Sequence, residues 1–233
     1  MRNIRILGCS FTQGIENLDR YGSNWVHYFR DLVDTKCTIY NYSQAGTGVM
    51  WHSYILNKLK KKYPDDIYIC QITNPGRYAW WPENMDINNF EKICFESEIS
   101  FTDGLKEYII NNKEVTFFNF GVAYNRKPED QRLKAIDLQF ARDYYDRTNN
   151  IHHWAINVNY MINNSDYSFF HLQETKEKYL NYISSEHIIS SSEEMIGSEI
   201  FKKEIIDDGK HLSDNGNKMV SRMVYEKTQG VIK

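Results

Sequence analysis

The most apolar strand that the sequence predicts is Asp66-Ile67-Tyr68-Ile69-Cys70-Gln71-Ile72. Its isoleucine-rich run is typical of a strand at the centre of a sheet. Residues 49–63, just upstream, carry apolar side chains at helical spacing and end at Pro64, which cannot continue a helix. Because strands and helices alternate around this segment, the sequence favours an α/β fold with a parallel sheet.

The same alternation extends in both directions. Further strands are predicted at Asn3–Leu7, Cys37–Tyr42, Tyr167–Leu172 and, more weakly, His187–Ile189. Helices are predicted from Ser23 or Asn24, over 49–63, within 129–161 with a break near Asn149, and from Ser213 or Asp214 to a C-terminal cap at Gly230. Residues 108–118 resemble a hairpin, and we expect 85–125 to be an insertion. Because the sequence contains no repeat and no linker, we predict one domain over 1–233.

Composition excludes several classes of protein. The net charge of −3 gives no reason to expect a nucleic-acid partner, and the basic cluster Lys58–Lys62 falls at the end of a predicted helix, where cations are favoured. No apolar run is long enough for a signal peptide or a membrane span, so we expect a cytoplasmic protein without a membrane partner; release by lysis or association with a virion stays open. The four cysteines, Cys9, Cys37, Cys70 and Cys94, have no metal-ligand spacing, so no metal is expected.

Gly8-Cys9-Ser10-Phe11-Thr12 directly follows the first predicted strand. In an open α/β sheet, functional groups gather at the carboxyl ends of the strands, so Ser10 is a candidate nucleophile. The alternative is ordinary turn chemistry, in which glycine permits the turn and the hydroxyl caps it.

Asp208-Gly209-Lys210-His211 leads into the last helix. A serine hydroxyl needs a base to accept its proton, and the base needs a group that orients it. An aspartate three residues before a histidine can bind the imidazole Nδ1 and leave Nε2 facing a nucleophile. The alternative is a polar loop in which Asp207 and Asp208 are solvated.

Two more segments follow predicted strands. Gly46, after the second strand, could offer a backbone N–H to an oxyanion, and the Asn74 amide, after the third, could donate to the same atom. The alternatives are a glycine-rich turn and an Asn-Pro turn.

Together, the order Ser10, Gly46, Asn74 and Asp208 with His211 resembles the SGNH hydrolase superfamily, also called GDSL esterases and lipases. The resemblance implies a three-layer α/β/α domain with a flavodoxin-like parallel sheet of about five strands. It implies a catalytic triad of Ser10, His211 and Asp208, and an oxyanion hole formed by the Ser10 and Gly46 amides and Asn74. No metal or organic cofactor is implied.

The motif departs from the family in two places. Cys9 stands where the family usually has the aspartate of Gly-Asp-Ser, and Thr73-Asn74-Pro75 replaces the commoner Gly-x-Asn-Asp. The form Gly-Cys-Ser-Phe-Thr looks like sequences of phage or environmental bacterial type.

The segment after Asn74 is dense in aromatic residues. Its side chains could bind substrate, because aromatic faces suit sugar rings and a guanidinium can meet an anionic group. The candidate substrate-binding residues are Arg77, Tyr78, Trp80 and Trp81. The alternative is that the tryptophans pack under the insertion. We interpret His27, His152, His153 and His171 as structural, because none has a partner at a recognisable spacing.

These features predict a serine esterase that removes a small O-acyl group, most simply acetyl, from a carbohydrate or small-molecule ester. Two alternatives remain open: a lipase or thioesterase acting on longer acyl chains, and a catalytically silent SGNH-like domain that binds glycans or belongs to a virion.

Overall fold

The computed structural model describes residues 2–13, 24–33, 37–43, 47–73, 79–80, 87–88, 91, 118–119, 151–182, 190–205 and 211–232. The predictions over 129–150 and at His187–Ile189 lie outside these ranges. Of the hairpin expected at 108–118, only Phe118 is described. It belongs to β5 (Phe118–Asn119), which pairs antiparallel with β4 (Ala79–Trp80).

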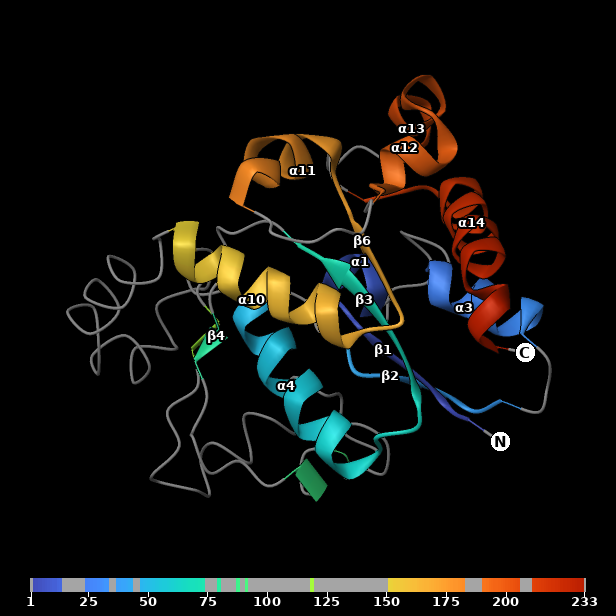
Figure 1. Cartoon of the computed structure of the whole chain (residues 1–233). Coiled ribbons are helices and arrows are strands. Elements are labelled where there is room, and N and C mark those ends of the chain that lie inside the picture. Colours follow the sequence, from blue (N-terminus) through green and yellow to red (C-terminus); the bar gives the residue numbers. More distant parts are fainter. Residues whose placement is uncertain are drawn as a thin grey trace, which may run out of the picture.

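Four parallel strands form the central sheet (Figure 1). They are β1 (Ile4–Leu7), β2 (Ile39–Asn41), β3 (Ile67–Ile72) and β6 (Tyr167–Phe170), in the order β2-β1-β3-β6. Ile4 on β1 aligns with Ile39 on one side and Ile67 on the other, and Ile69 aligns with Tyr167. The α/β fold with a parallel sheet is therefore confirmed.

A fifth segment touches the edge of the sheet beside β6. Phe170 forms a parallel bridge with Ser191, and its N–H donates to the Ser190 carbonyl oxygen over 2.9 Å. The described sheet has four strands rather than about five, but the chain returns beside β6 at Ser190 and Ser191, directly after the fifth strand that the sequence predicts at His187–Ile189. This strand order is that of a doubly wound, flavodoxin-like sheet.

Helices cover both faces of the sheet (Figure 1). On one face, α4 (Val49–Lys62) and α10 (Ile151–Asn164) pack over Tyr68, Cys70 and Ile72 of β3. On the other face, α3 (Trp25–Leu32) and α14 (Asp214–Ile232) pack over Ile67 and Ile69. Every residue of β3 is buried, because its side chains alternate between two apolar layers. The three-layer α/β/α arrangement is thus confirmed.

The shorter helices lie near the end of the sheet at the top of Figure 1. They are α11 (Gln173–Tyr179), the 3-10 turn η2 (Leu180–Tyr182), α12 (Ser192–Ile196) and α13 (Ser198–Glu204). Within the described ranges, no helix is both long and apolar enough to cross a membrane.

Local signals explain most helix boundaries. Asn24 caps α3 through its side chain, which accepts from the His27 N–H, and α4 ends with three lysines in its last turn before Pro64. The expected cap at Gly230 is wrong, because α14 continues through it to Ile232. Gly230 is exposed and only lowers helix propensity there, while Val224 and Thr228 hold the helix against the core.

The glycine between β1 and the next helix permits a close approach of two segments. A Cβ atom on Gly8 would lie 2.4 Å from Thr12 Oγ1, 2.7 Å from Thr12 Cβ and 3.2 Å from Gln71 Cβ. Thr12 and Gln71 are both buried, so neither can move aside freely. Any side chain at position 8 therefore separates the turn from β3.

We predict opposite effects for two Gly→Ala substitutions. Gly8→Ala should destabilise the protein by about 1–3 kcal/mol, the usual range for overpacking. Gly230→Ala, where a Cβ meets nothing within 4 Å, should stabilise it by about 0.5–1 kcal/mol through helix propensity. Denaturant unfolding of both variants beside wild type measures this, and equal stabilities would contradict the close approach.

Candidate active site

Ser10 begins a short helix immediately beyond β1. This helix, α1, spans Ser10–Gln13, and the turn closes where the Thr12 N–H donates to the Cys9 carbonyl oxygen over 2.9 Å. Ser10 is half-buried, whereas Cys9 is fully buried, so the hydroxyl rather than the neighbouring thiol is open to a substrate. The turn lies at the carboxyl edge of the sheet, where the sequence predicted it.

His211 lies near the start of α14, 201 residues further along the chain. Its Nε2 is 3.3 Å from Ser10 Oγ. An imidazole nitrogen at hydrogen-bond distance from a serine hydroxyl is the arrangement in which the base can take the proton of a nucleophile. The fold thus brings together two side chains that lie 201 residues apart in the sequence.

Aromatic rings flank this pair. The Phe11 ring lies 4.6 Å from the His211 ring and stacks on the His171 ring at 3.4 Å, measured between ring centroids. His171 directly follows β6, and its N–H donates to the Ile72 carbonyl oxygen. It is 3% exposed, which agrees with the structural role expected of it. Sequence reasoning missed its contact with Phe11, the residue after Ser10, although the position of His171 at the end of a parallel strand was a usable signal.

The other predicted catalytic residues lie outside the described ranges. They are Asp208, Gly46 and Asn74, and their roles stay predictions. The described residues beside two of them are well fixed. Thr47, next to Gly46, has its hydroxyl 2.8 Å from His52 Nε2, and Thr73, next to Asn74, is buried at the end of β3.

The predicted substrate-binding residues are also largely undescribed. Arg77, Tyr78 and Trp81 lie outside the described ranges, and only the backbone of Trp80 is placed, in β4. Of the other histidines, His27 is exposed on α3, and the side chains of His152 and His153 are not described.

The cysteines and acidic residues of the described part offer no metal site, since no group of three potential ligands forms there. Cys9 and Cys70 are buried and free, and Cys37 is free and half-buried. Burial raises the pKa of the Cys70 thiol to about 12, so this thiol stays protonated. Cys94 lies outside the described ranges.

A hydrogen-bonded clamp holds the segment that carries His211. Ile205 and Leu212 form an antiparallel bridge across residues 206–210, and the Ser213 N–H donates to the Glu204 carbonyl oxygen over 2.6 Å. The Glu204 carboxylate accepts from the Ser213 hydroxyl and, over 2.9 Å, from Asn215 Nδ2. These donors lower the pKa of the Glu204 carboxyl. No local pattern in the sequence indicates this clamp.

We predict that Glu204→Ala lowers the melting temperature by about 2–4 °C at neutral pH, since it removes hydrogen bonds worth about 1 kcal/mol. Because the pKa of Glu204 is lower in the folded state, its contribution is present at neutral pH and is lost as pH falls through the folded-state value. Differential scanning fluorimetry between pH 7 and pH 3 should therefore show the gap to wild type closing in acid.

The matched control is Glu199→Ala on the same helix. Glu199 is 83% exposed, and among the described residues its ion pair is with the exposed Lys202, an arrangement that contributes little. A Glu199 effect as large as that of Glu204, or a gap that does not change with pH, would contradict the clamp.

Comparison with known proteins finds relatives in structure but not in sequence. No family model and no curated protein matches the chain. Among solved structures, the psychrotrophic esterase EstA from Pseudoalteromonas sp. is similar with a TM-score of 0.50 and 9% identity, covering 100% of this chain and 99% of that one. The lipase Lip_vut3 from a goat rumen metagenome has a TM-score of 0.51 and 13% identity, covering 100% of both chains. TesA has a TM-score of 0.51 and 8% identity, covering 99% of both chains.

At these identities the likeness concerns the fold. The matches extend over whole chains, in agreement with the residues from Ser10 to His211 that carry the sequence resemblance. The chain therefore shares its fold with these three proteins, and that fold is the α/β/α arrangement that the sequence resemblance implies.

Proposed function

We propose that this protein is a serine hydrolase of carboxylic esters, with Ser10 as nucleophile and His211 as its base. The observation that carries the proposal is the 3.3 Å contact between Ser10 Oγ and His211 Nε2. Two further facts support it: the pair lies at the carboxyl edge of the sheet, where such folds hold their ligands, and structural neighbours include an esterase and a lipase.

The reaction follows from the chemistry of the pair. Ser10 Oγ attacks the ester carbonyl carbon while His211 Nε2 takes the hydroxyl proton, and a tetrahedral oxyanion forms. The C–O bond to the alcohol then breaks, and His211 returns the proton to the leaving oxygen. Water, activated by the same imidazole, attacks the acyl-Ser10 ester and releases the acid.

The remaining roles are assigned to the residues that the family pattern matches. Asp208 binds His211 Nδ1 and holds the imidazole with Nε2 toward Ser10. The Ser10 and Gly46 amides and the Asn74 side chain donate to the oxyanion. Donors of this kind contribute about 2.7–4 kcal/mol each when they act on the transition state.

For the substrate, we propose a small O-acyl group, most simply acetyl, on a carbohydrate. The support is the mixture of aromatic and polar side chains in Arg77-Tyr78-Ala79-Trp80-Trp81, which suits stacking on a sugar with directed hydrogen bonds. An acyl trough for a lipid would instead need a continuous apolar segment beside the motifs, and none occurs in the sequence.

We predict that a fluorophosphonate probe labels Ser10, and that Ser10→Ala abolishes both labelling and ester hydrolysis. His211→Ala should cost about as much, on the order of 10⁴-fold or more in kcat, because the two residues act as a unit. Asp208→Ala should leave more activity, because the aspartate orients the base and transfers no proton.

Ser221→Ala is the matched control. Ser221 is fully buried on α14, so the probe should label Ser10 in this variant as fully as in wild type. Peptide mass spectrometry locates the adduct. An adduct on another serine, or none on folded protein, would remove the catalytic proposal. A larger loss in Asp207→Ala than in Asp208→Ala would show that the neighbouring carboxylate orients His211.

We predict a higher kcat/KM for acetyl esters than for octanoyl or longer esters. Trp80→Ala or Trp81→Ala should weaken hydrolysis of an acetylated sugar more than that of an aryl acetate, because only the sugar stacks on the ring. Steady-state kinetics over a chain-length series test this. Faster turnover of long chains would favour a lipase or thioesterase, and equal losses on both acetates would make the tryptophans structural.

A further inference from the structure

Thr12, two residues beyond Ser10, is fully buried at the point where four elements meet. It lies in α1 and contacts residues of α3, β2 and β3 through hydrogen bonds of both its backbone and its side chain. Its N–H closes the turn on the Cys9 carbonyl oxygen. Ser10 and Phe11 lie between Cys9 and Thr12, which this hydrogen bond joins. Contacts that hold Thr12 in place therefore also hold the backbone of Ser10.

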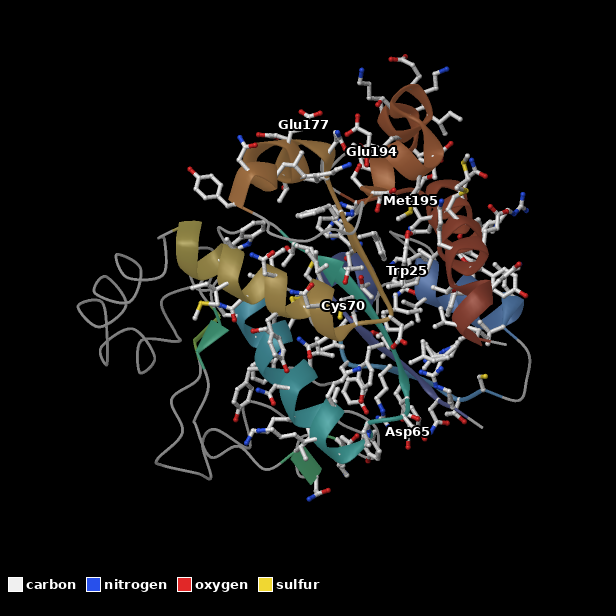
Figure 2. All side chains as sticks on the ribbon, in the orientation of Figure 1. Trp25, Asp65, Cys70, Glu177, Glu194 and Met195 are labelled. Carbon is white, nitrogen blue, oxygen red and sulfur yellow. The ribbon has the colours of Figure 1, made fainter. Side chains whose placement is uncertain are left out.

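The side chain of Thr12 forms the middle of a directed chain of hydrogen bonds. The indole N–H of Trp25 on α3 donates to Thr12 Oγ1 over 3.3 Å, and Thr12 Oγ1 donates to Gln71 Oε1 on β3 over 2.5 Å. An indole nitrogen can only donate, so the threonine hydroxyl accepts from it and donates its own proton onward. Trp25 and Gln71 are each 1% exposed, which leaves no water to replace a missing partner. Figure 2 shows Trp25 between α3 and the sheet.

The backbone oxygen of Thr12 is held by two side-chain amides. Asn24 Nδ2, at the cap of α3, donates to it over 2.7 Å, and Asn41 Nδ2, at the end of β2, donates over 2.9 Å. Both amides are themselves oriented, because the Asn24 oxygen accepts from the His27 N–H and the Asn41 oxygen accepts from the Ser43 N–H. Every polar atom of Thr12 is therefore used.

We propose that Thr12 is a positioning residue, which holds Ser10 Oγ in line with His211 through the chain from Trp25 to Gln71. The inference rests on the proposed function of Ser10. In this protein Cys9 stands where the SGNH family usually has the aspartate of Gly-Asp-Ser. The Cys9 thiol lies 3.9 Å from Gln71 Oε1, a long and weak contact. The strong hydrogen bonds that fix the turn therefore come from Thr12.

The test compares two buried threonines. Thr12→Val keeps the shape of the side chain and removes the hydroxyl, which leaves the Trp25 N–H and the Gln71 oxygen buried without their partner. Thr228→Val removes an equally buried hydroxyl from α14, where it donates to the Val224 carbonyl oxygen over 2.8 Å, outside the proposed site. Both variants should lose stability, but only the first should lose catalysis.

We expect Thr12→Val to lower kcat by about tenfold or more with KM within about twofold of wild type, since small displacements of a reacting group reduce rate rather than binding. The rate of fluorophosphonate labelling should fall in parallel. Thr12→Ser, which restores the hydroxyl, should recover most of kcat. Thr228→Val should keep the kcat of wild type. If Thr12→Val does not fold, Gln71→Met removes the acceptor at the other end and should show the same selective loss.

Hydrogen exchange followed by mass spectrometry provides a readout that needs no substrate. Peptides covering 8–13 should exchange faster in Thr12→Val than in wild type. In Thr228→Val, the same peptides should exchange at the wild-type rate. Equal loss of kcat in both variants, or unchanged protection of 8–13 in Thr12→Val, overturns the inference while the proposed function stands. A wild-type protein that neither labels nor hydrolyses esters removes the proposed function, and the exchange comparison still decides whether Thr12 holds the turn.

Discussion

The burial of β3 on both faces is the constraint on which the rest of the structure depends. A strand covered by helices on both sides takes parallel neighbours, because the connections between its neighbours are the covering helices themselves. The carboxyl ends of all four strands therefore meet at one edge, and the Ser10 turn, Ser43, Thr73 and His171 all follow strands there. Gln71 is the exception in this apolar strand, and its buried amide oxygen is satisfied by the turn that carries Ser10.

A second network of polar contacts joins β1 to the start of β3. Arg5 is 3% exposed on the face covered by α4, where its Nε donates to Asp66 Oδ2 over 2.7 Å and its guanidinium lies 3.5 Å from the centre of the Tyr63 ring. Glu91 accepts from Tyr42 and pairs with Lys62 at the end of α4. Because a buried charge without a partner is costly, this network specifies how β1 aligns with the start of β3. That register also sets where the Ser10 turn begins.

The sequence was most informative where local pattern and long-range packing agree. The strands at β1 and β3 were predicted to within one residue, and the pairing of Ser10 with His211 was expected from the family resemblance that their order carries. Prediction was poorer at Gly230, where local propensity favoured a cap but the buried side of α14 continues the helix. The contact of Phe11 with His171 could be expected only from the place of His171 at the end of a strand, because the two residues are far apart in the sequence. The clamp at Glu204 joins residues that no recognised spacing relates, so no pattern in the sequence indicates it.

The nucleophile and the base are supported by different elements, and α3 contacts both of them. Near its start, Asn24 and Trp25 bind Thr12 and so hold the Ser10 turn. One helical turn later, the Tyr28 hydroxyl donates to Asp214, the first residue of α14, three positions beyond His211. Residues three apart lie on neighbouring positions of a helix surface, so the two contacts keep a fixed spacing as long as this turn of α3 is intact. The 3.3 Å separation of Ser10 and His211 therefore depends on how α3 packs against the sheet and against α14, and a change in that helix can alter the pair without touching either residue.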